Sequence, residues 1–240
     1  MRRDHKPYYL KKLDLKCRDW YVRYFLKPQF TFLGRGYTFM KPWHVELFGE
    51  PIELGDYATV ITTPDHKVRL TIWSDILEER GGIRIGNYCL LCPGVRIQSA
   101  LEVTIGNNCM MASNAYITDS DWHEVYDRAD PLGKAAPVRI GNNVWIGDGA
   151  IVCKGVTIGD NSVIGARAVV VRDIPPNSIA AGNPAEVVNN IDTEKPMRTR
   201  ADWFSEPNLS YLMKKLDRDM LKGNTLLGWL RSLLFPVKGD

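Results

Sequence analysis

Aliphatic residues recur at every sixth position between residues 140 and 175 of this 240-residue chain. A small or branched residue follows four places after each of them. The leading residues are Ile140, Ile146, Val152, Ile158, Ile164 and Val170, followed by Val144, Ala150, Val156, Ser162, Ala168 and Ile174. On an α-helix a step of six rotates the side chain by about 240°, which would scatter these residues over three directions. On a strand, positions i, i+4 and i+6 share one face, so the pattern predicts short strands joined by corners.

The residues between the aliphatic positions are suited to corners. They include Gly141-Asn142-Asn143 and Gly159-Asp160-Asn161, and these residue types best tolerate tight turns and positive φ. The same six-residue spacing occurs upstream, with a weaker start at Leu54. Its leading residues are Ile85, Leu91 and Ile97 and, after a shift of two residues, Ile105, Met111 and Ile117. We expect a solenoid with a core lined by the repeat.

The repeat is interrupted between Ile117 and Ile140. The intervening segment, 118–139, is too long for a corner and should project as a loop; it contains one of the four histidines, His123. Long loops on a regular scaffold tend to carry function.

Helices are expected on both sides of the repeat. Residues 8–32 interleave aromatic and basic side chains at helical spacing, and the segment LSYLMKKLDRDMLKG returns to a helical pattern near the other end. We therefore divide the chain into a basic, aromatic-rich helical arm (1–50), a β-helical body (51–192) with the projecting loop, and a helical tail (193–240).

Composition and charge narrow the class of protein. The chain is 45% hydrophobic and 25% charged with a formal net charge of +3, which excludes a disordered or collagen-like protein. Basic residues predominate in the arm and acidic residues in the body. No apolar run approaches the length of a membrane span, and the first residues lack the apolar stretch of a signal peptide. We expect a cytoplasmic protein whose five cysteines are reduced.

The repeats, and above all the stretch VWIGDGAIVCKGVTIGDNSVIGARAVVVRDIPPNSIAAGNPAEVV, resemble the hexapeptide-repeat acyltransferases and are similar to the galactoside and maltose O-acetyltransferases. The resemblance covers residues 52–192 and implies a mainly β fold, a left-handed parallel β-helix. It also implies a homotrimer with active sites between neighbouring subunits, and acetyl-CoA as the acyl donor. The loop histidine of the family corresponds to His123, the expected general base. A neutral imidazole can take the proton of a hydroxyl as it attacks a thioester.

The resemblance also points to residues around the base and the donor. Asp121 and Glu124 are both candidates for the carboxylate that orients His123. Positions aligned with the family's CoA contacts are Asp148, Ala166, Val171 and Arg172, and Trp145 should point outward, beside the donor or against a neighbouring subunit. Arg172 is suited to the nucleotide phosphates. Because Glu186 and Asn189 stand where the sugar enzymes carry basic residues, Arg167, Arg198 and Arg200 are further phosphate candidates.

The acceptor pocket departs from the sugar enzymes. The family's acceptor-side asparagine coil falls on Leu91-Cys92-Pro93-Gly94, and its paired carboxylates fall on Ser99-Ala100. We expect a small-molecule or glycan acceptor, with acetyl transfer to a hydroxyl of a sugar or glycoconjugate. The alternative acceptor is the amine of an amino sugar or a xenobiotic.

Two other functions known for β-helical proteins fit this sequence less well than acyl transfer does. A non-catalytic scaffold would not need the histidine loop. A carbonic anhydrase-like enzyme needs several histidines at an interface, whereas the repeat region has only His66 and His123. Cys89 and Cys92 fall on opposite sides of the wall, and we expect no metal.

The ends of the chain suggest a further partner. The simplest role of the arm is to cap the solenoid. Its bases and aromatics, and the apolar segment TLLGWLRSLLFPV in the tail, also suit peripheral contact with the inner face of a membrane. No motif supports a nucleic-acid partner.

Overall fold

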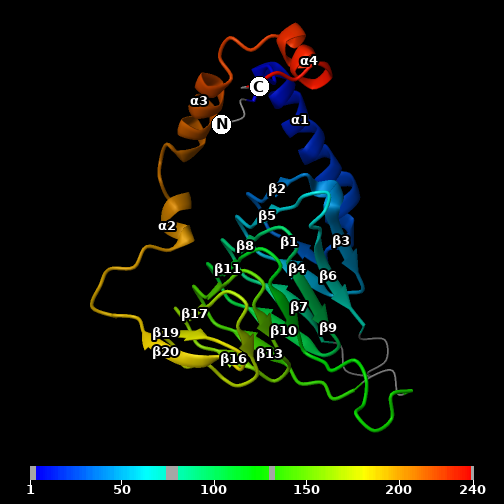
Figure 1. The fold of residues 1–240 in the computed structure, drawn as a ribbon, viewed down its shortest axis with the longest axis vertical. Helices are drawn as coiled ribbons and strands as arrows, with labels where there is room; N and C mark the ends of the chain where they lie inside the picture. Colours follow the sequence, from blue (N-terminus) through cyan, green and yellow to red (C-terminus); the bar gives the residue numbers. More distant parts are fainter. Residues whose placement is uncertain (1–3, 74–80, 130–132, 239–240) are drawn as a thin grey trace.

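The computed structural model describes residues 4–73, 81–129 and 133–238. Residues 1–3 of the predicted arm and 130–132 of the predicted loop lie outside the described residues. The body is built from three sheets that wind about one axis (Figure 1). The first sheet contains β1 (Phe32–Leu33), β4 (Ile52–Leu54), β7 (Gly82–Ile85), β10 (Glu102–Ile105), β13 (Val138–Ile140) and β16 (Thr157–Ile158).

The other two sheets complete the winding. The second contains β2 (Thr38–Met40), β5 (Thr59–Ile61), β8 (Leu90–Leu91), β11 (Met110–Met111), β14 (Trp145–Ile146), β17 (Val163–Ile164), β19 (Ser178–Ala181) and β20 (Glu186–Asn190). The third contains β3 (Val45–Phe48), β6 (Val68–Ile72), β9 (Arg96–Ser99), β12 (Tyr116–Thr118), β15 (Ile151–Val152) and β18 (Val169–Val170). From β1 to β18, three consecutive strands, one in each sheet, make one coil.

Parallel pairing places the repeat in register from coil to coil. Ile105 of β10 aligns with Ile85 of β7 on one side and with Ile140 of β13 on the other. The leading positions of the repeat from Ile85 to Val170 are all buried in one continuous core. Burying an aliphatic side chain of this size contributes roughly 1.5–3 kcal/mol. The predicted parallel β-helix and its inward register are confirmed.

Corner residues between the first and second sheets tie successive coils together. The side-chain oxygen of each corner residue accepts the backbone N–H of the corner before it. The bonds run from Arg35 to Asp56 (2.8 Å), Asp56 to Asn87 (2.8 Å), Asn87 to Asn107 (2.8 Å), Asn107 to Asn142 (2.9 Å) and Asn142 to Asp160 (2.6 Å). These Asn and Asp residues therefore do more than permit the turn that the sequence predicted.

The β-helix begins at Phe32, earlier than the predicted boundary at residue 51. Strands β1, β2 and β3 occupy residues that were assigned to the helical arm, and they pair in parallel with β4, β5 and β6. Their inward residues Leu33, Phe39 and Val45 keep the six-residue spacing. Gly34 follows Leu33 as Gly55 follows Leu54, and a Cβ on Gly34 would overlap the backbone of Asp56. The six-residue spacing is present in the sequence, but the aromatic residue at its middle position and the surrounding basic residues obscure the repeat.

Helices extend from both ends of the coil toward one pole of the molecule. Helix α1 (Tyr8–Tyr21) continues through a π turn (Val22–Leu26) and a 3₁₀ turn (Lys27–Gln29). The first and last residues of the π turn, Val22 and Leu26, join the core and cap its open end. A further 3₁₀ turn, Pro42–His44, separates β2 from β3. After β20 the chain runs back along the body to α2 (Arg200–Phe204), α3 (Leu209–Met220) and α4 (Leu226–Leu234), so that both ends of the chain lie at the same pole (Figure 1). Among the described residues, no helix combines the length and apolar character needed to cross a membrane.

Candidate active site

The projecting loop, residues 119–137 between β12 and β13, begins at a buried carboxylate. Asp119 accepts hydrogen bonds from the Ser99 hydroxyl (2.7 Å) and from the backbone N–H groups of Ala100 (2.7 Å) and Leu101 (2.9 Å). A buried charge is tolerated only when it is hydrogen-bonded, and three donors satisfy this one. Ser99 and Ala100, which align with acceptor carboxylates of the sugar enzymes, thus anchor the loop to the preceding coil.

The two limbs of the loop pair with each other and with the following coil. The Ala136 N–H donates to the Asp119 carbonyl (2.9 Å), and the Asp121 N–H donates to the Lys134 carbonyl (3.1 Å). The Gly155 N–H, at the same corner one coil further on, donates to the Ala136 carbonyl (2.9 Å). The loop base is therefore clamped between the coil before it and the coil after it.

Asp121 has a partner that its sequence position did not predict. Its carboxylate accepts a hydrogen bond from Lys154 Nζ at 2.6 Å. Glu124, the other predicted partner of the base, accepts the backbone N–H of Val125 (3.1 Å). No described residue forms a hydrogen bond or ion pair with the His123 imidazole, so Asp121 holds the loop to the next coil rather than contacting His123 in this structure.

His123 itself is exposed, while the backbone that carries it is fixed. Trp122, immediately before it, donates its indole N–H to the Thr118 hydroxyl (3.0 Å) and its backbone N–H to the Ser120 hydroxyl (3.1 Å). On the other side Gly133 lies against His123, and a Cβ at Gly133 would overlap the His123 backbone. Sequence reasoning missed the roles of Trp122 and Gly133. The available signal was the run of hydroxyl residues beside the only tryptophan in the loop.

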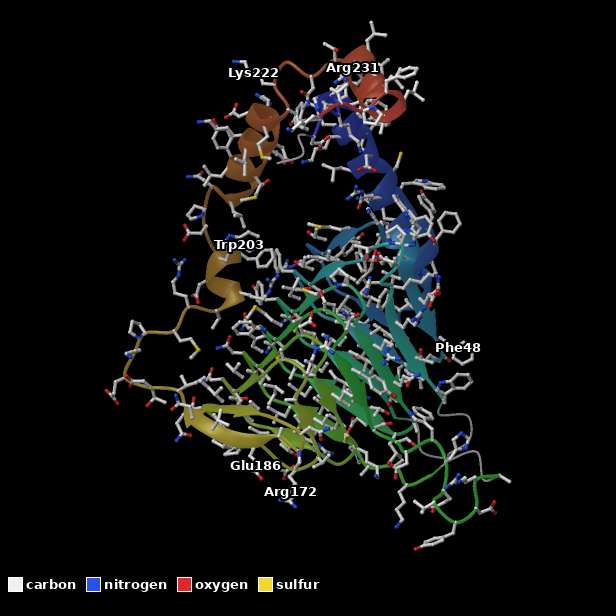
Figure 2. The ribbon with its side chains drawn as sticks, in the orientation of Figure 1. Phe48, Arg172, Glu186, Trp203, Lys222 and Arg231 are labelled. Carbon is white, nitrogen blue, oxygen red and sulfur yellow. The ribbon has the colours of Figure 1, made fainter. Side chains whose placement is uncertain are left out.

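The residues predicted to bind acetyl-CoA occupy two different corners of the coil. Asp148 and Ala166 lie on successive coils at the corner between the second and third sheets, where the Arg167 N–H donates to the Asp148 carbonyl (2.7 Å). Val171 and Arg172 follow β18 at the corner between the third and first sheets. That is the corner from which the histidine loop leaves, two coils earlier. Arg172 extends into solvent at the end of the body farthest from the terminal helices (Figure 2).

Trp145 lies on an apolar strip along the outer face of the second sheet. Its ring is 49% exposed, as predicted for an outward position. The strip follows the strand register and comprises Leu90, Met110, Trp145, Val163 and Ile179. An apolar strip of this kind suits either a bound donor or a neighbouring subunit.

The comparison with known families centres on the last two coils. Residues 137–172 match the model of the bacterial transferase hexapeptide family, six repeats. The matched residues contain β13 to β18 and carry the six-residue repeat of this family. The parallel coil extends beyond the matched residues, because β1–β12 before them and β19 after them pair in parallel within the same three sheets.

Two similar proteins extend the comparison. The galactoside O-acetyltransferase of Escherichia coli (strain K12) is 47% identical over 112 residues, which are 46% of this chain and 55% of that protein. The chain spans about half the length of the curated relatives it matches. An N-acyltransferase from Bacillus cereus, solved with dTDP-4-amino-4,6-dideoxyglucose and coenzyme A, superposes with a TM-score of 0.55 at 15% identity, over 81% of this chain and 94% of that one. At that identity the likeness concerns the fold. Together with the family match it identifies the coil as the predicted left-handed parallel β-helix.

Two of the four arginines considered for phosphate binding have structural partners. Arg200 donates from Nε to the Tyr88 carbonyl (2.6 Å) and from Nη2 to the Thr59 hydroxyl (3.0 Å), and burial lowers its pKa. Arg198 pairs with Glu206 at 3.1 Å. Arg167 and Arg172 are exposed and have no carboxylate partner among the described residues.

The cysteines of the β-helix lie as the register predicts. Cys89 is buried in the core and Cys92 is half-buried on the wall, and all five cysteines of the chain are free thiols. A hydrogen bond with Cys109, together with burial, raises the pKa of Cys89. In the parts of the chain that the structure describes, no three His, Cys, Asp or Glu side chains gather in an arrangement that could hold a metal ion.

Proposed function

We propose that this protein is a CoA-dependent acyltransferase that moves an acetyl group from acetyl-CoA to a hydroxyl of a sugar or glycoconjugate. One observation carries the proposal. His123 projects, exposed, from a loop whose base is clamped to the coils on both sides of a hexapeptide-repeat β-helix. The 47% identity to a galactoside O-acetyltransferase supports the choice of reaction.

His123 acts as the general base in a direct transfer. Its neutral imidazole takes the hydroxyl proton as the acceptor oxygen attacks the thioester carbonyl. The new C–O bond forms and the C–S bond breaks. The leaving thiolate of CoA then takes this proton from the imidazolium. Backbone N–H groups at the coil corners are suitable donors for the oxyanion. Asp121 supports the base indirectly, because its bond to Lys154 holds the loop.

The donor would lie along the late coils. Ala166 is small and exposed, so a flexible pantetheine chain can approach the backbone there, beside Asp148. Arg172, next to Val171, and Arg167 are the phosphate partners, since both are exposed and have no carboxylate partner among the described residues. In a homotrimer a neighbouring subunit would cover the apolar strip that contains Trp145 and would bring its own residues opposite the exposed His123.

Acetyl transfer from acetyl-CoA to a panel of sugars, glycoconjugates and amino sugars, followed by mass spectrometry, tests the proposal. We expect His123→Ala to lower kcat/KM by roughly 10²–10⁴-fold. His66→Ala is the matched control, since His66 pairs with Asp65 (2.9 Å) on the coil of β4–β6 and should leave activity unchanged. Transfer that is independent of His123, or no transfer to any acceptor, would contradict the proposal. Transfer to amines alone would replace the acceptor class.

A further inference from the structure

Helix α4 is oriented with its apolar side outward. Leu226, Leu227, Leu230, Leu233 and Leu234 share one face of the helix by their spacing and are all exposed, with Leu227 at 79% and Leu234 at 69%. Ser232, on the opposite face, is only 9% exposed. An amphipathic helix that packs on its own protein normally buries the apolar face. The orientation of α4 therefore leaves a leucine face that needs a partner.

The residues just after α4 extend this face. Phe235 and Val237 are 72% and 61% exposed and follow the last helical turn. Together with the five leucines they form what we call the α4 face. It contains no Asp or Glu, and its one charged helical residue is Arg231, which lies at the extreme pole of the molecule (Figure 2).

Basic residues lie on the segments of the arm and tail that contact one another beside α4. Contacts between the two ends of the chain hold these segments together. Lys11 of α1 pairs with Asp217 of α3 (2.6 Å), and the Asn224 side chain, before α4, donates to the carbonyls of Asp4 (2.7 Å) and Lys6 (3.1 Å). Basic residues of these segments without a carboxylate partner among the described residues include Lys6, Lys12 and Lys16 from the arm and Lys214, Lys215 and Lys222 from the tail.

We propose that the α4 face, together with these lysines of the neighbouring segments, binds the surface of an anionic lipid bilayer. The leucines and Phe235 would enter the boundary between headgroups and acyl chains, as interfacial helices do. The lysines would lie at the level of the lipid phosphates, where each basic residue strengthens binding by about fivefold. Charge complementarity selects this occupant, because a leucine surface without acidic groups, with lysines on the neighbouring segments, matches an apolar layer covered by anions.

The position of the α4 face constrains what the bound protein can reach. In Figure 1, α4 and the loop after β12 lie at opposite ends of the long axis of the molecule. Docking through α4 would therefore hold the His123 loop away from the bilayer. The surface would localise the protein near the membrane while the candidate site faces the aqueous phase, so an acceptor must be soluble or extend well beyond the lipid headgroups.

Vesicle co-sedimentation of the full chain tests the proposal. We expect binding to vesicles of phosphatidylcholine that contain phosphatidylglycerol, weak binding to phosphatidylcholine alone, and weakening with added salt. Leu227→Ser combined with Leu234→Ser should reduce binding by roughly tenfold or more, and Lys215→Glu combined with Lys222→Glu by a similar factor. The matched control removes two exposed valines from β20 at the other end of the molecule, Val187→Ser and Val188→Ser, and should bind as the parent does.

Three further measurements decide the outcome. Unchanged thermal melting of the leucine variant would show that the fold is intact, and its unchanged acetyl transfer in solution would separate the surface from the proposed active site. No binding to phosphatidylglycerol vesicles, or equal loss in the β20 control, would overturn the proposal. If the leucine variant instead altered the oligomeric mass by light scattering without any vesicle binding, the α4 face would be a protein–protein contact and the proposal would be wrong.

Discussion

The Lys154 ammonium donates a hydrogen bond to the Asp121 carboxylate at 2.6 Å, across the corner from which the histidine loop leaves the β-helix. The pair joins a loop residue two positions before His123 to the next coil. The exposed imidazole thus projects from a base that is held by contacts distant in sequence, and this arrangement yields several predictions.

Replacing Lys154 with Met should impair catalysis more than stability. The pair is partly exposed, so its loss should cost less than about 1 kcal/mol of unfolding free energy. A loosened loop displaces the base, and we expect kcat to fall by about tenfold while KM for acetyl-CoA changes little. Steady-state kinetics of Lys154→Met, Asp121→Asn and the double variant check this. Additive losses in the double variant would show that the two residues do not act as a pair.

Asp119→Asn should destabilise the domain strongly. The three groups that bond to the Asp119 carboxylate are all donors. The NH₂ group of an asparagine would face one of them with another donor, where the carboxylate offered an acceptor. We expect a loss of about 2–4 kcal/mol, measured by urea unfolding at fixed protein concentration. Asp127→Asn, in the exposed part of the same loop, provides the comparison and should be nearly neutral.

Gly133→Ala should lower activity with the fold retained. The added methyl would overlap the backbone of His123, so the two limbs of the loop must separate. Gly223→Ala is a useful comparison, because nothing lies within 4 Å of that site and the cost there arises only from its φ of +82°. Equal transferase activity of Gly133→Ala and the parent would argue against a precisely positioned His123.

Acid should weaken the coil of β1–β3 partly through Glu46. Hydrogen bonds from Lys67 and then Arg69 lower the pKa of Glu46 below its ordinary 4.5. A carboxyl with a depressed pKa in the folded protein stabilises the fold above its unfolded pKa, and this contribution is lost as the pH falls through the folded pKa. The side chains are partly exposed, so the effect should stay below about 1 kcal/mol. Melting temperatures of Glu46→Gln should therefore depend less on pH below 4.5 than those of the parent; an identical acid dependence would contradict this role.

The limits of sequence reasoning are visible in particular residues. The spacing of Leu33, Phe39 and Val45 carries the repeat into the region assigned to the arm, but the aromatic Phe39 and the basic residues around it obscure the pattern. Arg200 was a phosphate candidate by charge, yet it binds the Tyr88 carbonyl and the Thr59 hydroxyl. Nothing local to Arg200 indicates these partners, because they lie more than a hundred residues earlier in the chain.

The six-residue spacing alone dictates the coil, its inward residues and the place where a loop must project. These are periodic properties of short segments, and alternation along a strand decides which side chains face inward. Three-dimensional packing decided how the His123 loop is held, which arginines are engaged, and that α4 turns its leucines outward. Each of these depends on contacts between residues far apart in the chain, and the free energy of such contacts exists only once the coils have assembled.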